Sequence, residues 1–207
     1  MSLEFNTNSI IRCRPKYREN LMRTLIQKYL ESAQEIIDHL DVKEIEDLAV
    51  AINEVRESSG TVFVAGNGGS ASTASHFATD LGVGSMKVSK HVRVVSLTDN
   101  VAVMTAISND RSYESVFEQQ LQLLGKEGDM LVLISASGNS KNLITALKTS
   151  QEMGMKSYSL TGFDGGELRR MTLGSNVHVP SNMGEYGLVE DAHLAICHMI
   201  TECMRSK

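Results

Sequence analysis

The sequence contains no run of basic residues, and this absence narrows the classes of protein to which it can belong. Of its 207 residues, 22% are charged, and the formal net charge is -5. A protein that binds nucleic acid through its phosphates needs a basic patch, so we do not expect nucleic-acid binding. No apolar segment approaches the length of a membrane span, and no secretory apolar core follows the first basic residues. We therefore expect no membrane association.

Cysteine is also scarce. Cys13, Cys197 and Cys203 are odd in number, and no two of them have CxxC spacing. This usage is typical of reduced thiols and not of a disulfide framework, so we expect a cytoplasmic protein.

Both common nucleotide-binding fingerprints are missing, although the chain has a glycine-rich turn. The apolar run at 62–65 ends in GNGGS at 66–70, and a helical stretch follows to Leu81. A strand, a glycine turn and a helix N-terminus suit an anion, because the glycines allow close approach and the first helical N–H groups are unpaired. Neither GxxxxGK[ST] nor GxGxxG fits. We therefore expect no nucleotide cofactor, and a phosphate on a small molecule as the anion.

Short apolar segments alternate with helical patterns along the rest of the chain. Segments at 62–65, 92–97, 130–134, 156–161 and 176–180 are predicted strands. The segment MLVLI at 130–134 is apolar throughout, which is typical of a central parallel strand, whereas Pro180 indicates an edge. We predict an α/β fold with one domain: a mostly parallel five-stranded sheet flanked by helices in three layers, flavodoxin-like or Rossmann-like. Ligands in such sheets bind at the carboxyl ends of the strands, at a topological switch point.

Two predicted helices precede the first strand, at 21–40 and 42–56. They cannot both be crossovers, so they either cover the sheet or contact another subunit. The first has a broad apolar stripe, which favours subunit contact for part of it. We divide the chain into a flexible N-terminal arm, 1–20, and a single domain, 21–207, whose helices at 21–57 serve oligomer contacts.

A second loop of small residues, SASGNS at 135–140, follows the third predicted strand. Its serines offer hydroxyl and backbone donors to a small anion. Serine is also common at helix N-caps, and alone the motif favours that interpretation. Together with the glycine turn at the same sheet edge, it favours a phosphate site. Neither loop contains lysine or arginine, so neutral donors and helix dipoles would hold the phosphate.

Two helices carry a carboxylate and a histidine each. His76 and Asp80 are spaced i, i+4 and share a face, and Glu190 and His198 lie about two turns apart, roughly on one face. Such helices could converge on a metal or an acid/base pair. The same spacing also fits solvated helix faces. His193 lies on a different face, and we interpret it as a packed or interfacial histidine.

The glycine turn, HFA at 76–78, SASGNS and the acidic and histidine residues of the last helix together resemble the SIS (sugar isomerase) domain family. Within that family they are similar to the phosphoheptose isomerase group. The resemblance runs from the first long helix to the end of the chain. It implies isomerisation of a sugar phosphate between aldose and ketose, of the sedoheptulose 7-phosphate type, through an enediol. It also implies a homotetramer with a bundle of N-terminal helices and sites between subunits, to which the last helix contributes.

The resemblance assigns roles residue by residue. Asp80 would be the catalytic base and His198 the acid. In members with zinc, the ligands correspond to His76, Asp80, Glu190 and His198. The residues implied in substrate binding are Asn67, Gly68, Gly69, Ser70, Asp99, Ser135, Ser137, Ser140 and Glu190.

The chain departs from the group's pattern at several of these positions. Asp80 replaces a glutamate, Glu190 replaces a glutamine, and Gly84 and Gly187 replace an arginine and a polar residue. The extra carboxylate favours a divalent cation, and the two glycines imply that the sugar is bound differently. The alternative is a non-catalytic phosphosugar sensor or interaction protein, as in the related DnaA-associating protein. Retention of both Asp80 and His198 favours the enzyme.

Overall fold

Five parallel strands form the centre of the protein. The computed structural model describes residues 15–88, 90–172 and 175–205. The strands are β1 (Thr61–Gly66), β2 (Arg93–Ser96), β3 (Met130–Ser135), β4 (Lys156–Thr161) and β5 (Asn176–His178). They pair in the order β2-β1-β3-β4-β5, and every pairing is parallel. The predicted parallel sheet is confirmed, with β3 at its centre and β5 at an edge.

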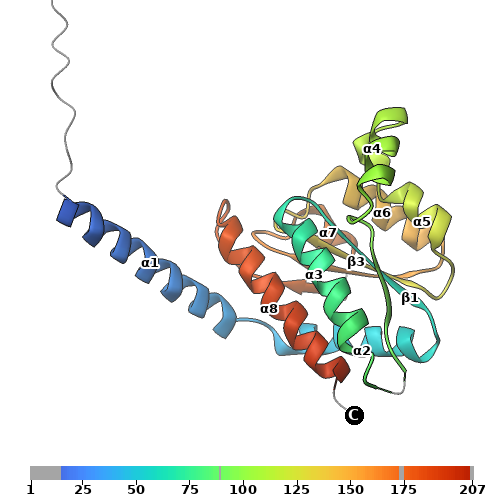
Figure 1. Ribbon diagram of the computed structural model, residues 1–207, viewed down its shortest axis with the longest axis horizontal. Helices are drawn as coiled ribbons and strands as arrows, with labels where there is room; N and C mark the ends of the chain where they lie inside the picture. Colours follow the sequence, from blue (N-terminus) through green and yellow to red (C-terminus); the bar gives the residue numbers. More distant parts are fainter. Residues whose placement is uncertain (1–14, 89, 173–174, 206–207) are drawn as a thin grey trace, which may run out of the picture.

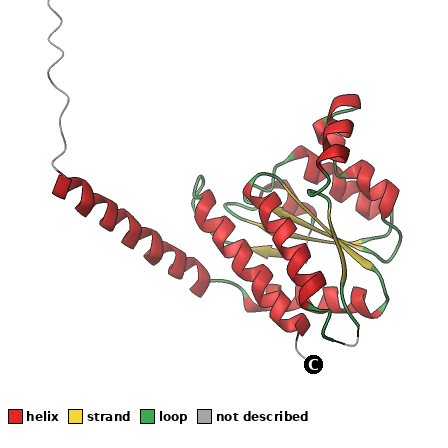
Figure 2. Cartoon of the chain, in the orientation of Figure 1, coloured by secondary structure: helices red, strands yellow, loops and turns green. Residues whose placement is uncertain are grey.

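Helices cover both faces of the sheet (Figure 1, Figure 2). They are α1 (Pro15–Asp38), α2 (Val42–Glu57), α3 (Gly69–Gly84), α4 (Val101–Asp110), α5 (Glu118–Leu124), α6 (Lys141–Glu152), α7 (Gly166–Met171) and α8 (Tyr186–Arg205), with a 3-10 turn at Tyr113–Ser115. Side chains of α2, α3 and α8 share one core with one sheet face, and side chains of α5, α6 and α7 share a second core with the other. The strands alternate between these cores: Val62 and Val64 face the first, and Phe63 and Ala65 the second. The three-layer prediction is confirmed.

Helix α1 begins earlier than its apolar pattern predicts. Its first residue is Pro15. Proline suits the first position of a helix, because the backbone N–H that it lacks would have no partner within the helix there. Residues 15–20 therefore belong to the helix and not to the predicted arm, and the remainder of that arm, 1–14, lies outside the described residues. Figure 1 shows α1 projecting from the domain, with only its C-terminal end against the body.

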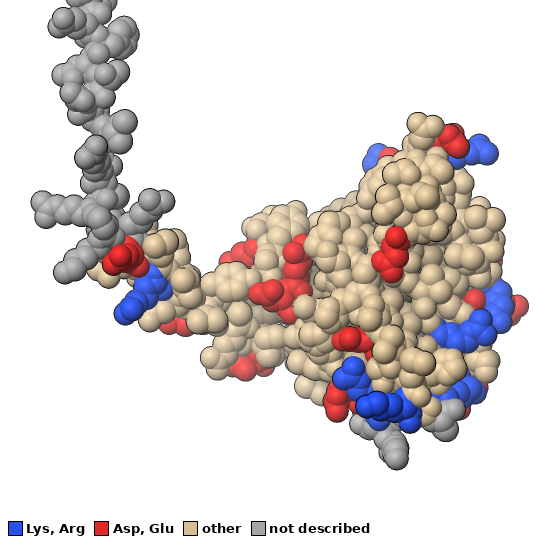
Figure 3. Space-filling view, in the orientation of Figure 1, with Lys and Arg blue, Asp and Glu red and all other residues tan. Residues whose placement is uncertain are grey.

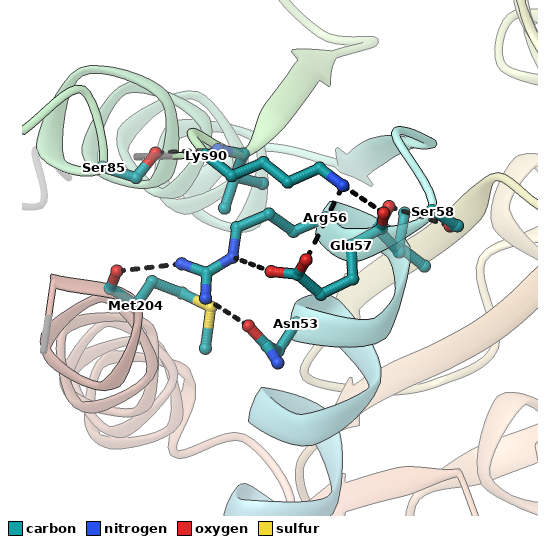
Figure 4. Close-up of polar contacts among 9 residues, drawn as sticks. Asn53, Arg56, Glu57, Ser58, Ser85, Lys90 and Met204 are labelled. Atoms are coloured by element: carbon teal, nitrogen blue, oxygen red, sulfur yellow. Dashed lines mark hydrogen bonds and ion pairs between the residues drawn. The ribbon is translucent and has the colours of Figure 1, made fainter. Parts of the chain in front are cut away.

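The end of α2 is joined to the end of α8 by one arginine (Figure 4). The guanidinium of Arg56 donates to the carbonyl of Met204 at 3.2 Å and to the side chain of Asn53. It also lies 3.7 Å from a carboxylate oxygen of Glu57. A cation beside the last carbonyls of a helix is favoured by the helix dipole, so Arg56 fixes the C-terminal end of α8 against α2.

No helix in the described part of the chain is both long and apolar enough to cross a membrane.

Candidate active site

The two small-residue loops lie side by side at the carboxyl edge of the sheet. The chain passes from β1 to β2 on one side and from β3 to β4 on the other, so β1 and β3 flank the topological switch point. Gly66, the last residue of β1, pairs with Ile134, next to the last residue of β3. The glycine turn and the SASGNS loop therefore lie at the same edge of the sheet, as predicted.

Reciprocal amide hydrogen bonds join the two loops. Asn67 in the glycine turn donates to Asn142 of α6 at 2.9 Å and accepts a hydrogen bond from the Asn142 amide at the same distance. The hydroxyl of Tyr113 donates to the Asn67 oxygen at 2.7 Å. Asn67 thus holds the cradle together, and its predicted contact with substrate remains a prediction. Asn142 and Tyr113 lie outside every sequence motif, because their roles depend on the meeting of β1 and β3.

The glycine turn brings the first turn of α3 back over the end of β1. A Cβ on Gly66 would lie only 2.4 Å from the carbonyl oxygen of Ser70, so no larger residue fits there. Gly68, the N-cap of α3, has a φ of 55° and offers no side-chain cap. Ser70 is buried at this helix start, with no side-chain hydrogen bond to any described residue. The turn therefore presents backbone N–H groups and one hydroxyl to an anion.

The SASGNS loop is held rigidly against α7. The hydroxyl of Ser135 accepts from the Gly138 N–H at 3.1 Å. The side chain of Asn139 accepts from the Glu167 N–H at 3.0 Å and donates to the Ser137 carbonyl at 2.9 Å. Ser140 is the N-cap of α6, yet its hydroxyl makes no capping bond. Ser140 thus occupies the N-cap position, as one interpretation of the motif predicts. Its hydroxyl does not cap the helix and is available to a ligand.

Three of the four residues predicted as metal ligands converge. The Nε2 atom of His76 lies 3.2 Å from Asp80 Oδ2, and the Nε2 atom of His198 lies 3.7 Å from the same oxygen. The two Nε2 atoms are 3.1 Å apart, and the rings meet edge to face. All three side chains are partly exposed, so solvent and ligands can reach them. His76 and Asp80 come from α3 and His198 from α8.

This cluster forms within a single chain. The resemblance led us to expect that the last helix completes the site across a subunit boundary, but α3 and α8 of the same chain pack together and place His198 against His76 and Asp80. Each residue offers one ligand atom within 4.8 Å of the others. Two imidazoles and one carboxylate form a donor set that zinc accepts in sites with one open position.

Glu190 lies away from this cluster. Its carboxylate covers Gly69, where a Cβ would lie 2.2 Å from one of its oxygens. Gly69 is the first residue of α3, about two turns before His76. The side chain predicted as the fourth ligand is therefore at the N-terminus of α3, beside the predicted phosphate cradle, where the helix dipole favours a negative charge.

Asp99 follows β2 and is fixed next to α3. Its carboxylate accepts hydrogen bonds from the hydroxyls of Ser75, Ser96 and Thr98, at 3.1 Å for Ser96 and 3.4 Å for Thr98. Asp99 is thus in contact with α3 at the residue before His76. Its role in substrate binding remains a prediction.

A contact that the sequence did not signal joins α1 to the start of α8. The hydroxyl of Tyr29 donates to Asp191 at 2.6 Å, and this bond raises the pKa of Tyr29 to about 12. A Cβ on Gly187 would lie 3.0 Å from that hydroxyl. The space left by the missing side chain at position 187 is thus partly occupied by Tyr29.

Two further groups of α8 are excluded from the site by burial. His193 is fully buried, as its interpretation as a packed residue predicts. Burial lowers the pKa of His193 to about 4, so its ring is neutral at pH 7. Burial and the nearby charge of Asp80 raise the pKa of the Cys197 thiol, which keeps it protonated and a poor nucleophile.

Comparison with known proteins agrees with these features. The SIS domain family matches residues 28–162. A phosphoheptose isomerase of Helicobacter pylori (strain P12) is 37% identical over 180 residues, which are 86% of this chain and 88% of that one. A phosphoheptose isomerase of Aliarcobacter butzleri (strain RM4018) is 35% identical over 178 residues, 86% of this chain and 88% of that one.

A solved structure extends the likeness to three dimensions. The phosphoheptose isomerase of Neisseria gonorrhoeae superposes with a TM-score of 0.78 at 31% identity, covering 90% of this chain and 98% of that one. The likeness thus extends over more of the chain than the matched SIS segment. The chain belongs to the SIS domain family and, within it, to the phosphoheptose isomerases.

Proposed function

We propose that this protein interconverts the aldose and ketose forms of a sugar phosphate, with sedoheptulose 7-phosphate as the substrate to test first. The observation that carries the proposal is the convergence of His76, Asp80 and His198 on the helix that starts at the phosphate cradle. Ser70 and His76 are six residues apart on α3, a rise of about 9 Å. That separation suits a molecule with a phosphate at one end and a reacting carbon several bonds away.

The cradle binds the phosphate without a charged side chain. Hydroxyls of Ser70, Ser135, Ser137 and Ser140 and the first N–H groups of α3 donate hydrogen bonds to the phosphate oxygens. Because Asn67 and Asn142 join the two loops, these donors keep their positions when the anion arrives. The backbone of Gly68 and Gly69 completes this end of the site, and Asp99, held by Ser75 next to His76, would contact the sugar and not the phosphate.

The reaction requires one base and one acid. Asp80 removes the proton from the carbon next to the carbonyl, the C–H electrons form a carbon–carbon double bond, and the carbonyl electrons move to its oxygen, giving an enediolate. The proton of the neighbouring hydroxyl then passes to the enediolate oxygen, the electrons of that O–H bond form the new carbonyl, and the carbon–carbon double bond takes a proton from His198 at the former carbonyl carbon. Proton transfer by positioned groups contributes typically about 10²–10⁴-fold to a rate.

A divalent zinc ion fits the cluster. His76, Asp80 and His198 would hold it with an open position for a substrate oxygen. Bound there, it would act as a Lewis acid on the oxygens of the reacting carbons. Glu190, at Gly69, is not needed for this three-ligand arrangement.

The functional unit contains more than one chain. The N-terminal half of α1 carries Leu21, Leu25, Ile26 and Leu30, which are between 49% and 63% exposed. A helix with an apolar stripe in solvent is unstable alone, so we assign the helices at 21–57 to contacts within a homotetramer. The reduced cysteines Cys197 and Cys203 suit a cytoplasmic enzyme.

Replacement of the two acid/base residues tests this function. Asp80→Asn and His198→Ala should each reduce turnover of sedoheptulose 7-phosphate about 10²–10⁴-fold while leaving the melting temperature close to that of the wild type. Exchange of the substrate's carbon-bound hydrogen with D2O, followed by NMR, reports the enediol step directly. Asp47→Asn, at an exposed position of α2, is the matched control.

Full activity of either variant would contradict the roles given to Asp80 and His198. A screen of pentose, hexose and heptose phosphates by thermal shift covers the non-catalytic alternative. Binding without turnover or deuterium exchange for every sugar would favour a sensor.

A further inference from the structure

Helices α3 and α8 run parallel, and polar side chains follow one another in the same order along their seam (Figure 1). Glu190 covers Gly69, His198 contacts His76 and Asp80, and Arg205 covers Gly84. The three contacts are spaced by about two turns on each helix, so they lie on one face of each. Three groups therefore follow one another along the seam: the phosphate cradle, the acid/base cluster and the guanidinium of Arg205.

The guanidinium of Arg205 is placed where a side chain at position 84 would otherwise be. A Cβ on Gly84 would lie 2.8 Å from both Nε and Nη2 of Arg205. Gly84 comes four residues after Asp80, which is one turn and about 6 Å further along α3 on the same face. Basic side chains gather at this end of the α3–α8 pair, near the C-terminus (Figure 3). Arg205 thus brings a positive charge to the side of the acid/base cluster opposite the phosphate cradle.

The ion pair of Arg205 with Glu202 does not account for this placement. Arg205 lies 3.9 Å from Glu202 one turn earlier, and these side chains are 45% and 75% exposed. Exposed pairs of this kind typically contribute under about 1 kcal/mol. The guanidinium can therefore leave Glu202 for a substrate at little cost.

We propose that Arg205 is a substrate-binding residue that donates N–H hydrogen bonds to the carbonyl oxygen of the sugar and to the enediolate oxygen formed from it. This inference rests on the proposed isomerase function. An open-chain sugar phosphate has its phosphate at one end and its two reacting carbons, one of them the carbonyl, at the other. With the phosphate in the cradle, the reacting carbons reach the acid/base cluster, and the oxygens at that end of the sugar reach the guanidinium. When Asp80 takes the proton, negative charge develops on the carbonyl oxygen, and a fixed donor there stabilises the transition state. A guanidinium offers five N–H donors and keeps its charge at any working pH.

Replacement of Arg205 should affect the chemical step more than phosphate binding. Arg205→Gln should lower kcat for sedoheptulose 7-phosphate by about 100-fold, the typical effect of losing one oxyanion donor. Arg205→Lys should recover part of this loss. Arg170→Gln, in the last turn of α7, is the control, because it removes a comparable surface charge far from the seam.

Gly84 provides a second, independent variant. In Gly84→Ala the new methyl group meets the flexible end of Arg205, so the guanidinium moves while the fold is retained. Gly84→Ala should lower kcat several-fold in the wild-type background and have no further effect in Arg205→Gln. This non-additivity is expected only if the position of the guanidinium over Gly84 matters. Additive losses, or equal losses in melting temperature, would indicate a structural role.

Binding measurements separate this inference from the proposed function. By calorimetry, Arg205→Gln should weaken binding of sedoheptulose 7-phosphate at least several-fold and leave binding of inorganic phosphate unchanged. Wild-type binding without turnover would reject the isomerase function but leave Arg205 as a sugar-binding residue. Unchanged kcat and unchanged sugar-phosphate binding in Arg205→Gln would reject the inference alone, and a wild type that binds no sugar phosphate would reject both.

Discussion

At the scale of single residues, the carboxylate of Glu190 controls which anions can approach the first turn of α3. It covers Gly69, next to the hydroxyl and N–H groups that we assign to phosphate binding. Two negative groups at one helix N-terminus repel each other, and the repulsion between unit charges about 4 Å apart in water is about 1 kcal/mol. A bound phosphate must therefore either displace the Glu190 carboxylate or bind more weakly because of the repulsion.

Glu190→Gln should bind inorganic phosphate about fivefold more tightly than the wild type, because the substitution removes that repulsion and keeps the shape of the side chain. Calorimetry at constant ionic strength measures the change. Zinc content after purification without chelator should be the same as in the wild type, since Glu190 lies outside the cluster, whereas His198→Ala should lose zinc. Unchanged phosphate affinity together with a loss of zinc in Glu190→Gln would show that Glu190 moves to the metal.

The motifs predicted which residues carry chemistry but not where each side chain points. His76, Asp80 and His198 were found from spacing and resemblance, and the structure brings them together. The spacing of Glu190 and His198 on one face was equally clear, yet Glu190 lies two turns away from the cluster along the seam. Spacing within one helix shows on which face of the helix a residue lies. Only the packing of the two helices decides which residues of the other helix its side chain contacts.

At the scale of elements, α1 leaves several large apolar side chains exposed within one chain. Its C-terminal half packs on the domain through Ala33 and Ile36, and Tyr29 bonds to Asp191. The preceding turns expose Ile26 and Leu30 to 62% and 63%. Burial of one such side chain contributes about 1.5–3 kcal/mol, so repetition around a symmetric assembly is strongly favourable.

Ile26→Glu should convert the protein from an oligomer to a monomer at micromolar concentration, because it places a charge in the apolar stripe. Light scattering coupled to size-exclusion chromatography gives the mass. Thr24→Glu is the matched control, since two residues along a helix lie about 200° apart and this change adds the same charge to the opposite face. A wild-type monomer, or equal masses for both variants, would contradict the assignment of α1 to subunit contacts.

The order and type of the elements followed from the sequence, and their ends did not. Apolar runs such as 130–134 and helical periods are strong signals, and each corresponds to a strand or helix of the structure. Helix α5 is preceded by a 3-10 turn at Tyr113–Ser115 and begins only at Glu118, a start that its apolar residues do not mark. The final strand ends at His178 and not at Pro180, and Pro180 follows the last hydrogen bond of the edge strand, from Val179 to Thr161.

At the scale of the whole molecule, helix α8 is packed against the sheet by side chains that the active site does not use. His193 is the clearest example: it lies on α8 near Thr161 of β4 and His178 of β5, and neither ring nitrogen makes a hydrogen bond of ordinary geometry. The Thr161 backbone favours the charged form slightly, but burial outweighs it and lowers the pKa of His193 to about 4. A fully buried, neutral imidazole links global stability to pH.

The direction of that link follows from proton binding. The ordinary pKa of histidine is 6.5, and that of folded His193 is about 4. Between these two pH values the residue binds a proton in the unfolded chain but not in the folded one. Stability must therefore fall as the pH falls through this window, by about 3 kcal/mol from this group, and no part of the loss occurs above it. The half-buried His178, whose pKa burial also lowers to about 4, adds a smaller loss of the same sign.

His193→Leu should remove most of this dependence. Leucine is similar in size, leaves no ring nitrogen without a partner, and cannot bind a proton, so the variant should be at least as stable as the wild type near pH 5. Urea unfolding at several pH values between about 7 and 4.5 measures the slope, with His91→Leu at an exposed position as the control. The wild type and the control should lose stability in parallel toward acid pH, while His193→Leu loses much less. If all three lose stability equally, protonation of His193 does not drive the acid sensitivity, and carboxylates elsewhere in the domain must carry it.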